Sequence, residues 1–268
     1  MKRLACLFAL LPCLALAQID YSLNVDVPAK SITVSIRLEK ADATQEFRIP
    51  YWCPGFYFIQ NYQRKISDVV ATDAEGNTLR IHRPDERAWL VQNPKGGPIR
   101  LTYRVLGDDG GLGFFCVSVR DRAAFVNGAA AFMYPEGRLD EPCRLAIGKL
   151  PTKWEIATPM DPKGDKWEAA GYDEFIDHPI QMGLLERRKF EVEEIPFEAV
   201  FVRSERDMRC DPDAETARLK QVAAPAIRMF GGAPFKRYLF IIHLDPGNFD
   251  GGLEHRACNV INTADSRP

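Results

Sequence analysis

The feature that most constrains this chain is a series of short segments in which apolar and polar residues alternate. Residues 19–27 (IDYSLNVDV) and 31–39 (SITVSIRLE) both follow this period of two, and Pro28 lies between them. Such alternation is typical of strands with one buried face. Further segments of this kind recur as far as residue 150, separated by glycine, proline, asparagine and aspartate. Evenly spaced short strands predict a mainly β protein that begins with a β-sandwich.

Local signals place several elements within this pattern. Residues 68–82 predict a hairpin that turns at Glu75-Gly76-Asn77, and residues 114–121 and 130–134 predict strands. The glycine-rich stretch at residues 108–113 (DDGGLG) precedes one of these strands. A phosphate-binding loop needs a helix to open after its glycines. We therefore expect a mobile hairpin loop here.

The pattern changes after residue 185. Residues 189–203 predict two strands separated at Pro196, and residues 236–244 (KRYLFIIHL) predict a buried strand. Between them, Asp211 is a favourable helix cap, Pro212 suits the first turn, and the glycines at 231–232 end the helix. We expect a sandwich over residues 18–185 and a partial α+β segment over residues 186–268.

The first residues predict a targeting signal. Lys2 and Arg3 precede an apolar run over residues 4–16, and Ala15-Leu16-Ala17 fits a cleavage site. The run is too short to span a membrane. We expect a signal peptide over residues 1–17, a mature chain that starts at Gln18, and a secreted or periplasmic location.

Charge and cysteine content limit the partners. Without Lys2 and Arg3 the chain keeps 33 of its 35 basic residues beside 37 acidic ones, a net charge of −4. This balance argues against nucleic acid and anionic membranes as partners. Beyond the signal peptide an odd number of cysteines remains, which leaves open both one or two disulfides and buried thiols. These residues are Cys53, Cys116, Cys143, Cys210 and Cys258.

The sequence offers few candidates for catalysis. It contains neither H-E-x-x-H nor G-x-S-x-G, the common signatures of zinc peptidases and serine hydrolases. Of its four histidines, His82 is expected at the surface and His178 in a turn, while the spacing of His243 and His255 fits no zinc site. Cys258 could pair with His255 as nucleophile and base. Residues three apart on one strand point to opposite faces, which argues against that pair.

Residues 51–57 (YWCPGFY) combine a strand end, a Pro-Gly turn and four aromatic side chains. Two interpretations exist for this corner. It could plug the core at the edge of the sandwich, or it could form the wall of a binding cleft. The physical properties of the residues favour the core plug.

Several segments in order resemble the glycyl aminopeptidase family of zinc metallopeptidases. They are Trp52-x-Pro54-Gly55-x-Tyr57, Trp89 in RAWLV, FVNGAAAFMY from Phe125, YDEFIDHPI from Tyr172, MFGGAPFKRYLF from Met229 and GGLEH from Gly251. The resemblance implies an N-terminal β-sandwich followed by a thermolysin-like catalytic domain. It also implies that residues 251–255 form a strand beside the substrate cleft. Gly251 and Gly252 would let a peptide backbone approach, and Glu254 would hold the free amine of a peptide.

The chain departs from the family pattern in one respect. Family members carry a zinc-binding H-E-x-x-H helix after the Gly-Gly-x-Glu-His strand, and only thirteen residues follow His255 here. We therefore expect residues 186–268 to be a truncated start of the catalytic domain, with no catalytic residue, no metal ligand and no cofactor, whereas complete members bind zinc. Peptide N-termini remain the expected partners. The alternative is a non-catalytic secreted sandwich that binds peptides or another protein.

Overall fold

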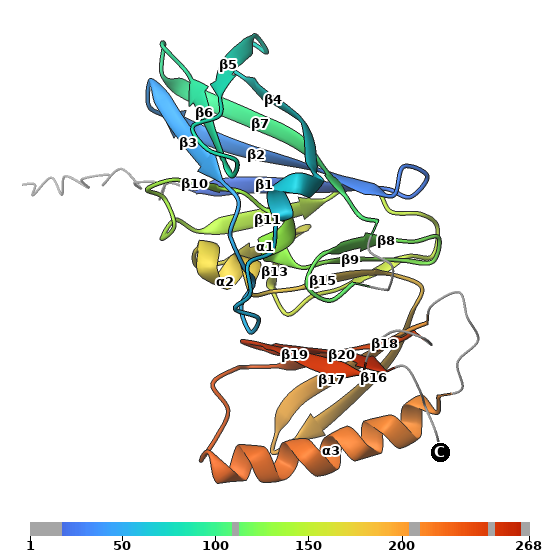
Figure 1. The fold of residues 1–268 in the computed structure, drawn as a ribbon. Coiled ribbons are helices and arrows are strands. Elements are labelled where there is room, and N and C mark those ends of the chain that lie inside the picture. Colours follow the sequence, from blue (N-terminus) through green and yellow to red (C-terminus); the bar gives the residue numbers. More distant parts are fainter. Residues whose placement is uncertain (1–17, 109–112, 204–209, 246–249, 264–268) are drawn as a thin grey trace, which may run out of the picture.

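The computed structural model describes residues 18–108, 113–203, 210–245 and 250–263. Strands dominate these residues and form three sheets (Figure 1). The first sheet has eleven strands in the order β10-β3-β6-β5-β4-β7-β2-β1-β11-β14-β13. Its strands are β1 (Ile19–Asp26), β2 (Ser31–Ala41), β3 (Thr44–Arg48), β4 (Ile66–Thr72), β5 (Thr78–His82), β6 (Ala88–Gln92), β7 (Gly97–Leu106), β10 (Tyr134–Pro135), β11 (Cys143–Ile147), β13 (Asp161–Lys163) and β14 (Lys166–Ala169).

The second sheet has the order β12-β15-β9-β8 and packs against the first. Its strands are β8 (Val117–Val119), β9 (Ala123–Val126), β12 (Glu155–Ala157) and β15 (Ile180–Gly183). Three short helical segments lie in the connections of this part, and they are η1 (Tyr62–Lys65), α1 (Gly128–Ala131) and α2 (Tyr172–Ile176). Together these elements form the expected mainly β sandwich.

The alternating sequence pattern is the origin of the core. On β2 the apolar side chains of Ile32, Val34, Ile36 and Leu38 are fully buried, and the polar residues between them are not. Fully burying one such side chain stabilises the fold by roughly 1.5–3 kcal/mol. The mainly β fold therefore follows directly from the period of two.

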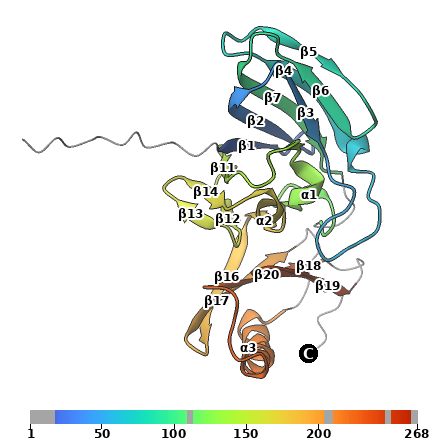
Figure 2. The same cartoon turned by 90° about the vertical axis from the view of Figure 1, so that its left-hand side faces the viewer.

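The third sheet has the order β16-β17-β18-β20-β19 and lies below the sandwich (Figures 1 and 2). Its strands are β16 (Leu185–Val192), β17 (Ile195–Arg203), β18 (Tyr238–Leu244), β19 (Gly251–His255) and β20 (Cys258–Thr263), and the helix α3 (Pro212–Met229) covers one face. β17, β18 and β20 run parallel, whereas β16 and β19 are antiparallel strands at the two edges. As expected, Asp211 caps α3 by accepting hydrogen bonds from the N–H groups of Asp213 and Ala214.

The two faces of the third sheet have different neighbours. On β18, Leu239 and Ile241 belong to the large core that includes the sandwich, whereas Phe240 and Ile242 pack in a second cluster with α3. The large core is therefore continuous across residue 185. The third sheet begins at the expected boundary, but the independence of the two parts as domains stays a prediction.

The structure corrects three local predictions. Pro196 does not separate two strands, because the turn lies at Glu193-Glu194 and Pro196 pairs with Glu191 inside the hairpin. The strand expected at residues 130–134 is replaced by α1 and the short β10. The strand expected from residue 114 begins only at Val117.

Two further points concern loops and membranes. Most of the glycine-rich stretch at 108–113 lies outside the described residues, so its expected character stays a prediction. Across the described ranges, no helix combines the length and apolar character needed to cross a membrane.

Candidate functional site

The strand β19 carries the residues that the sequence singled out. Gly251, Gly252 and Glu254 all lie on this strand, which is the last in the order of the third sheet. Leu253 and His255 are buried, whereas Gly252 and Glu254 are exposed. Successive side chains of a strand point to opposite faces. Gly252 and Glu254 therefore share an exposed face, opposite to Leu253 and His255.

The exposed face of β19 is the one that continues toward α3. Leu253 packs in the core shared with the sandwich, so Glu254 points away from the sandwich. Across the sheet, Glu254 lies opposite Asn259, which in turn lies opposite Phe240 of the cluster beneath α3. The carboxylate is therefore presented at the sheet edge, on the side of α3.

Gly252 has a packing requirement as well as a place on the edge. A Cβ atom at this position would lie 3.3 Å from Oδ1 of Asn259, closer than most side-chain contacts. That oxygen is buried and has no hydrogen-bond partner among the described residues. Glycine therefore leaves the backbone of β19 accessible beside an unsatisfied acceptor.

A loop from the sandwich reaches β19 (Figures 1 and 2). In this loop, between β3 and β4, Gly55 has a φ of +81°, which glycine adopts at little cost. A Cβ atom on Gly55 would lie 2.7 Å from Cδ1 of Leu253 and 3.1 Å from the carbonyl oxygen of Glu254. The loop and the strand are thus in direct contact, and a larger residue at position 55 would separate them.

Most aromatic side chains of this loop face solvent. Tyr57 is 77% exposed, Phe58 is 70% exposed, and Tyr51 and Trp52 are about half exposed, whereas Cys53 is buried. The prediction of a core plug is therefore wrong for Tyr51, Trp52 and Tyr57, and it holds for Cys53 and for Phe56, which packs against the core and stacks on Phe115. Exposed aromatic surface of this kind beside a strand edge is typical of an interaction site.

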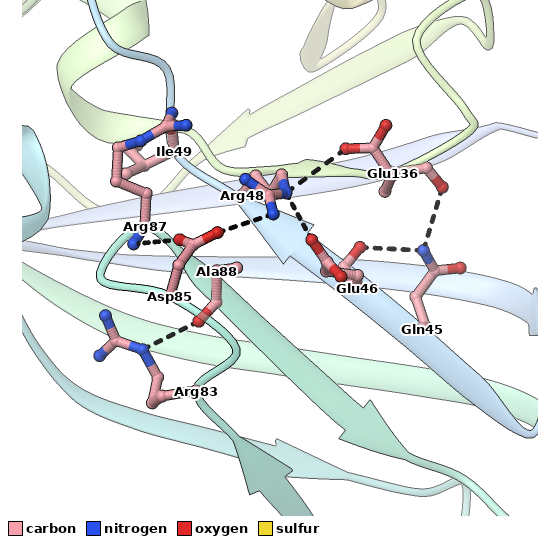
Figure 3. Close-up of polar contacts among 9 residues, drawn as sticks. All are labelled: Gln45, Glu46, Arg48, Ile49, Arg83, Asp85, Arg87, Ala88 and Glu136. Carbon is pink, nitrogen blue, oxygen red and sulfur yellow. Dashed lines mark hydrogen bonds and ion pairs between the residues drawn. The ribbon is translucent and has the colours of Figure 1, made fainter.

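A network of charged residues fixes the start of the loop (Figure 3). Nη1 of Arg87 donates to the carbonyl oxygen of Ile49 at 2.9 Å. The guanidinium of Arg87 also lies over the ring of Tyr51. Asp85 accepts from the backbone N–H of Arg87 at 2.7 Å and from Arg48 at 2.8 Å. These hydrogen bonds lower the pKa of Asp85, the backbone bond first. The exposed aromatic residues therefore extend from a rigid base.

His255 and Cys258 are arranged differently from the prediction. A turn at residues 256–257 places them opposite each other on β19 and β20, so they share a face. Burial raises the pKa of the Cys258 thiol well above its usual range, which disfavours the thiolate. Nδ1 of His255 lies 2.9 Å from Oδ1 of Asp177. Both side chains are buried, which argues against a nucleophile–base pair that a substrate could reach, and the expected geometric reason was wrong.

His243 occupies a buried polar network between the sandwich and the third sheet. Its Nε2 lies 2.8 Å from Oε1 of Gln181 and its Nδ1 lies 2.9 Å from Oδ1 of Asn262. The amide nitrogen of Gln181 already donates to two backbone carbonyls, so its oxygen accepts from Nε2–H. Turning the Asn262 amide by half a turn lets its Nδ2, otherwise buried without a partner, donate to Nδ1. The neutral ring is then fully satisfied.

The described residues do not fit a zinc ion. No group of three or more histidine, cysteine, aspartate or glutamate side chains in the described part of the chain could hold a metal. Both ring nitrogens of His243 are occupied, and Nδ1 of His255 is bonded to Asp177. His178, expected in a turn, is buried, and burial lowers its pKa. His82 is exposed as expected.

Sequence reasoning missed three of these residues. Asp177, Arg87 and Asn259 are polar residues without a recognisable motif of their own, and their partners lie far away in the chain or on a neighbouring strand. The segment around Asp177 belongs to one of the stretches that resemble the peptidase family, which was the only available signal.

The chain is similar to known proteins both in sequence and in structure. Residues 20–184 match the family described as Peptidase M61 N-terminal domain. Among solved structures, the chain is similar to an aminopeptidase N family protein from Idiomarina loihiensis, with 26% identity and a TM-score of 0.83. The match covers 91% of this chain and 42% of that protein, so this chain spans less than half of its length. No curated protein sequence matches the chain. Because the family match covers more than half of its residues, the chain belongs to the Peptidase M61 N-terminal domain family.

Proposed function

We propose that this chain is the N-terminal region of a secreted, glycyl-aminopeptidase-like metallopeptidase, and that it presents peptide N-termini at β19 without cleaving them. The exposed face of β19, with Gly252 and Glu254 at a sheet edge, carries this proposal. An extended peptide can add to such an edge as a further strand. The carboxylate of Glu254 can accept hydrogen bonds from the peptide's ammonium group.

Two observations support this assignment. The aromatic loop contacts β19 at Gly55 and offers exposed rings to the side chains of a bound peptide. The similar protein from Idiomarina loihiensis is described as an aminopeptidase N family protein, and aminopeptidases act at free N-termini. The 268 residues contain no H-E-x-x-H, and the described residues do not fit zinc, which supports inactivity of this chain alone.

Calorimetric titration with a matched pair of peptides tests the proposal. One glycine-first tetrapeptide amide has a free amine and its twin is N-acetylated. A charged hydrogen bond contributes roughly 1.5–3 kcal/mol, and less when it is solvent-exposed. We expect the free peptide to bind up to about ten times more tightly, and Glu254→Gln to remove the difference.

Glu191→Gln is the matched control, because Glu191 is an exposed acid at the opposite edge of the same sheet. It should bind like the wild type. Equal affinity of the wild type for both peptides would refute a role for Glu254. Cleavage of a glycyl-anilide that a chelator abolishes would refute the proposed inactivity.

Secretion rests on residues 1–17 and needs its own test. N-terminal sequencing of protein from the periplasmic fraction should read from Gln18. An intact Met1 in that material would overturn the proposed cleavage.

A further inference from the structure

Asp177 of the sandwich holds the end of β19 with both of its carboxylate oxygens. Oδ1 lies 2.9 Å from Nδ1 of His255, and Oδ2 accepts from the backbone N–H of Arg256 at 3.1 Å. Asp177 follows α2, whereas its partners lie almost eighty residues later at the tip of the β19–β20 hairpin. A single side chain therefore bridges two parts of the fold.

The His255 end of this bridge is isolated from water. The His255 side chain is fully buried and that of Asp177 is only 19% exposed. Nε2 of His255 is buried and has no hydrogen-bond partner among the described residues. Asp177 is thus the one polar anchor that the described structure gives to this ring. Hydrogen bonds to a charged group in a low-dielectric site are stronger than ordinary ones.

Asp177 restrains β19, an edge strand with few other contacts to hold it in place. β19 pairs with β20 along one side only, because it is the last strand in the sheet order. An edge strand of five residues is prone to local opening unless it is tied down. Packing of Leu253 against Gly55 holds the middle of β19, and Asp177 holds its end.

We infer that Asp177 is a positioning residue that fixes the orientation of Glu254 from the opposite face of β19. His255 points into the sandwich and its neighbour Glu254 points away from it. Restraining the ring of His255 and the N–H of Arg256 prevents the strand from rotating about its axis. The carboxylate of Glu254 is thereby held in one direction. The consequence for peptide recognition rests on the proposed function, whereas the restraint of β19 does not.

Hydrogen exchange of the full chain tests the restraint. Asp177→Ala removes both acceptors, and Asp173→Ala is the control because Asp173 is exposed and lies on α2, the short helix that Asp177 follows. We expect amides at residues 251–258 to exchange at least about ten times faster in Asp177→Ala. Exchange across β2 should stay unchanged in both variants. Unchanged exchange at 251–258, or equal acceleration across β2, would overturn the inference.

If Asp177→Ala does not fold, Asp177→Asn is the second variant, because it keeps the shape of the side chain. Its amide can keep both partners only if the proton of His255 moves from Nδ1 to Nε2, which leaves a buried N–H without a partner among the described residues, so exchange at 251–258 should rise severalfold. The same variant should reduce the preference for the free over the acetylated peptide toward a ratio of one, an effect that lower global stability alone would not produce. A preference equal to that of the wild type would refute positioning of Glu254. If the wild type itself shows no preference, the proposed function fails and the exchange measurement alone decides the role of Asp177.

Discussion

The stability of this protein should fall between pH 7 and pH 4 because of His243. Burial lowers the pKa of His243 from 6.5 to about 4. In the unfolded chain the ring keeps its ordinary pKa. Between the two values the unfolded state binds a proton that the folded state does not, so acid favours unfolding.

The size of this effect follows from the two pKa values. The contribution of His243 is fully present above pH 6.5 and declines as the pH falls toward 4. One pKa unit corresponds to about 1.4 kcal/mol, so the loss is roughly 1 kcal/mol at pH 6, 2 kcal/mol at pH 5 and 3 kcal/mol at pH 4. His178 contributes with the same sign, because burial also lowers its pKa.

Urea unfolding at constant ionic strength isolates the contribution of His243. His243→Gln does not titrate, and its amide can still donate to Gln181 and accept from Asn262. The quantity to compare is the free energy of unfolding of the wild type minus that of the variant. This difference should be about 2 kcal/mol smaller at pH 5 than at pH 7. His82→Gln changes an exposed histidine and should follow the wild type. A wild-type–variant difference that is the same at pH 7 and pH 5 would refute the reasoning.

Three further outcomes follow from buried groups. The hydroxyl of Tyr103 donates to the Ala131 carbonyl at 2.8 Å and accepts from the Met133 N–H at 2.9 Å. Tyr103→Phe leaves both backbone groups without this partner, so it should destabilise the chain by about 1–3 kcal/mol for each group. Chemical denaturation checks this, and an unchanged midpoint would contradict it. Gly128→Ala should lower the melting temperature by several degrees, since a Cβ there would lie 2.6 Å from the backbone of Ile176; a calorimetric trace identical to the wild type would contradict it. A thiol reagent at pH 8 should label only two of the cysteines at residues 53–258 in the folded protein. Rapid labelling of more than two would be inconsistent with the burial of the others. The reactive pair is Cys116 and Cys210, which are only partly buried; the protected ones are Cys53, Cys143 and Cys258, which are buried.

The parts of the fold that depend on local chemistry could be predicted from the sequence. Gly76 has a φ of +86° in the expected β4–β5 hairpin, and Asp211 and Pro212 open the expected helix. In each case the signal and the structure lie within a few residues of each other. Periodicity in the same way determined β1 and β2.

Other parts depended on residues that are distant in sequence or on unusual backbone conformations. The turn before β17 uses Glu193 and Glu194 with φ values of +50° and +63°, which glutamate rarely adopts, so the nearby Pro196 was the stronger but misleading signal. The segment at 128–131 is apolar enough for a strand. It forms a helix because Asn127 accepts a hydrogen bond from the N–H of Ala129.

The residues of the candidate site also divide into those that the sequence identifies and those that only the folded structure identifies. The resemblance to a peptidase family identified Glu254, and the structure places it on an exposed strand edge. Asp177 and the aromatic loop could not be assigned to that strand, because only the folded chain brings residues 55 and 177 next to residues 253–256. The association of these residues with β19 depends on tertiary contacts, which the local sequence does not reveal.

The position of β1 sets an order for folding when the chain becomes available from its N-terminus onward. β1 lies inside the eleven-stranded sheet, between β2, which follows directly, and β11, with which it pairs in parallel from Ile19↔Cys143 onward. More than a hundred further residues therefore have to become available after β1 before its second side gains a partner. Until then β1 would offer an open, apolar hydrogen-bonding edge to any neighbouring chain. Protection against aggregation should matter most before the segment around residue 147 is available to pair with β1.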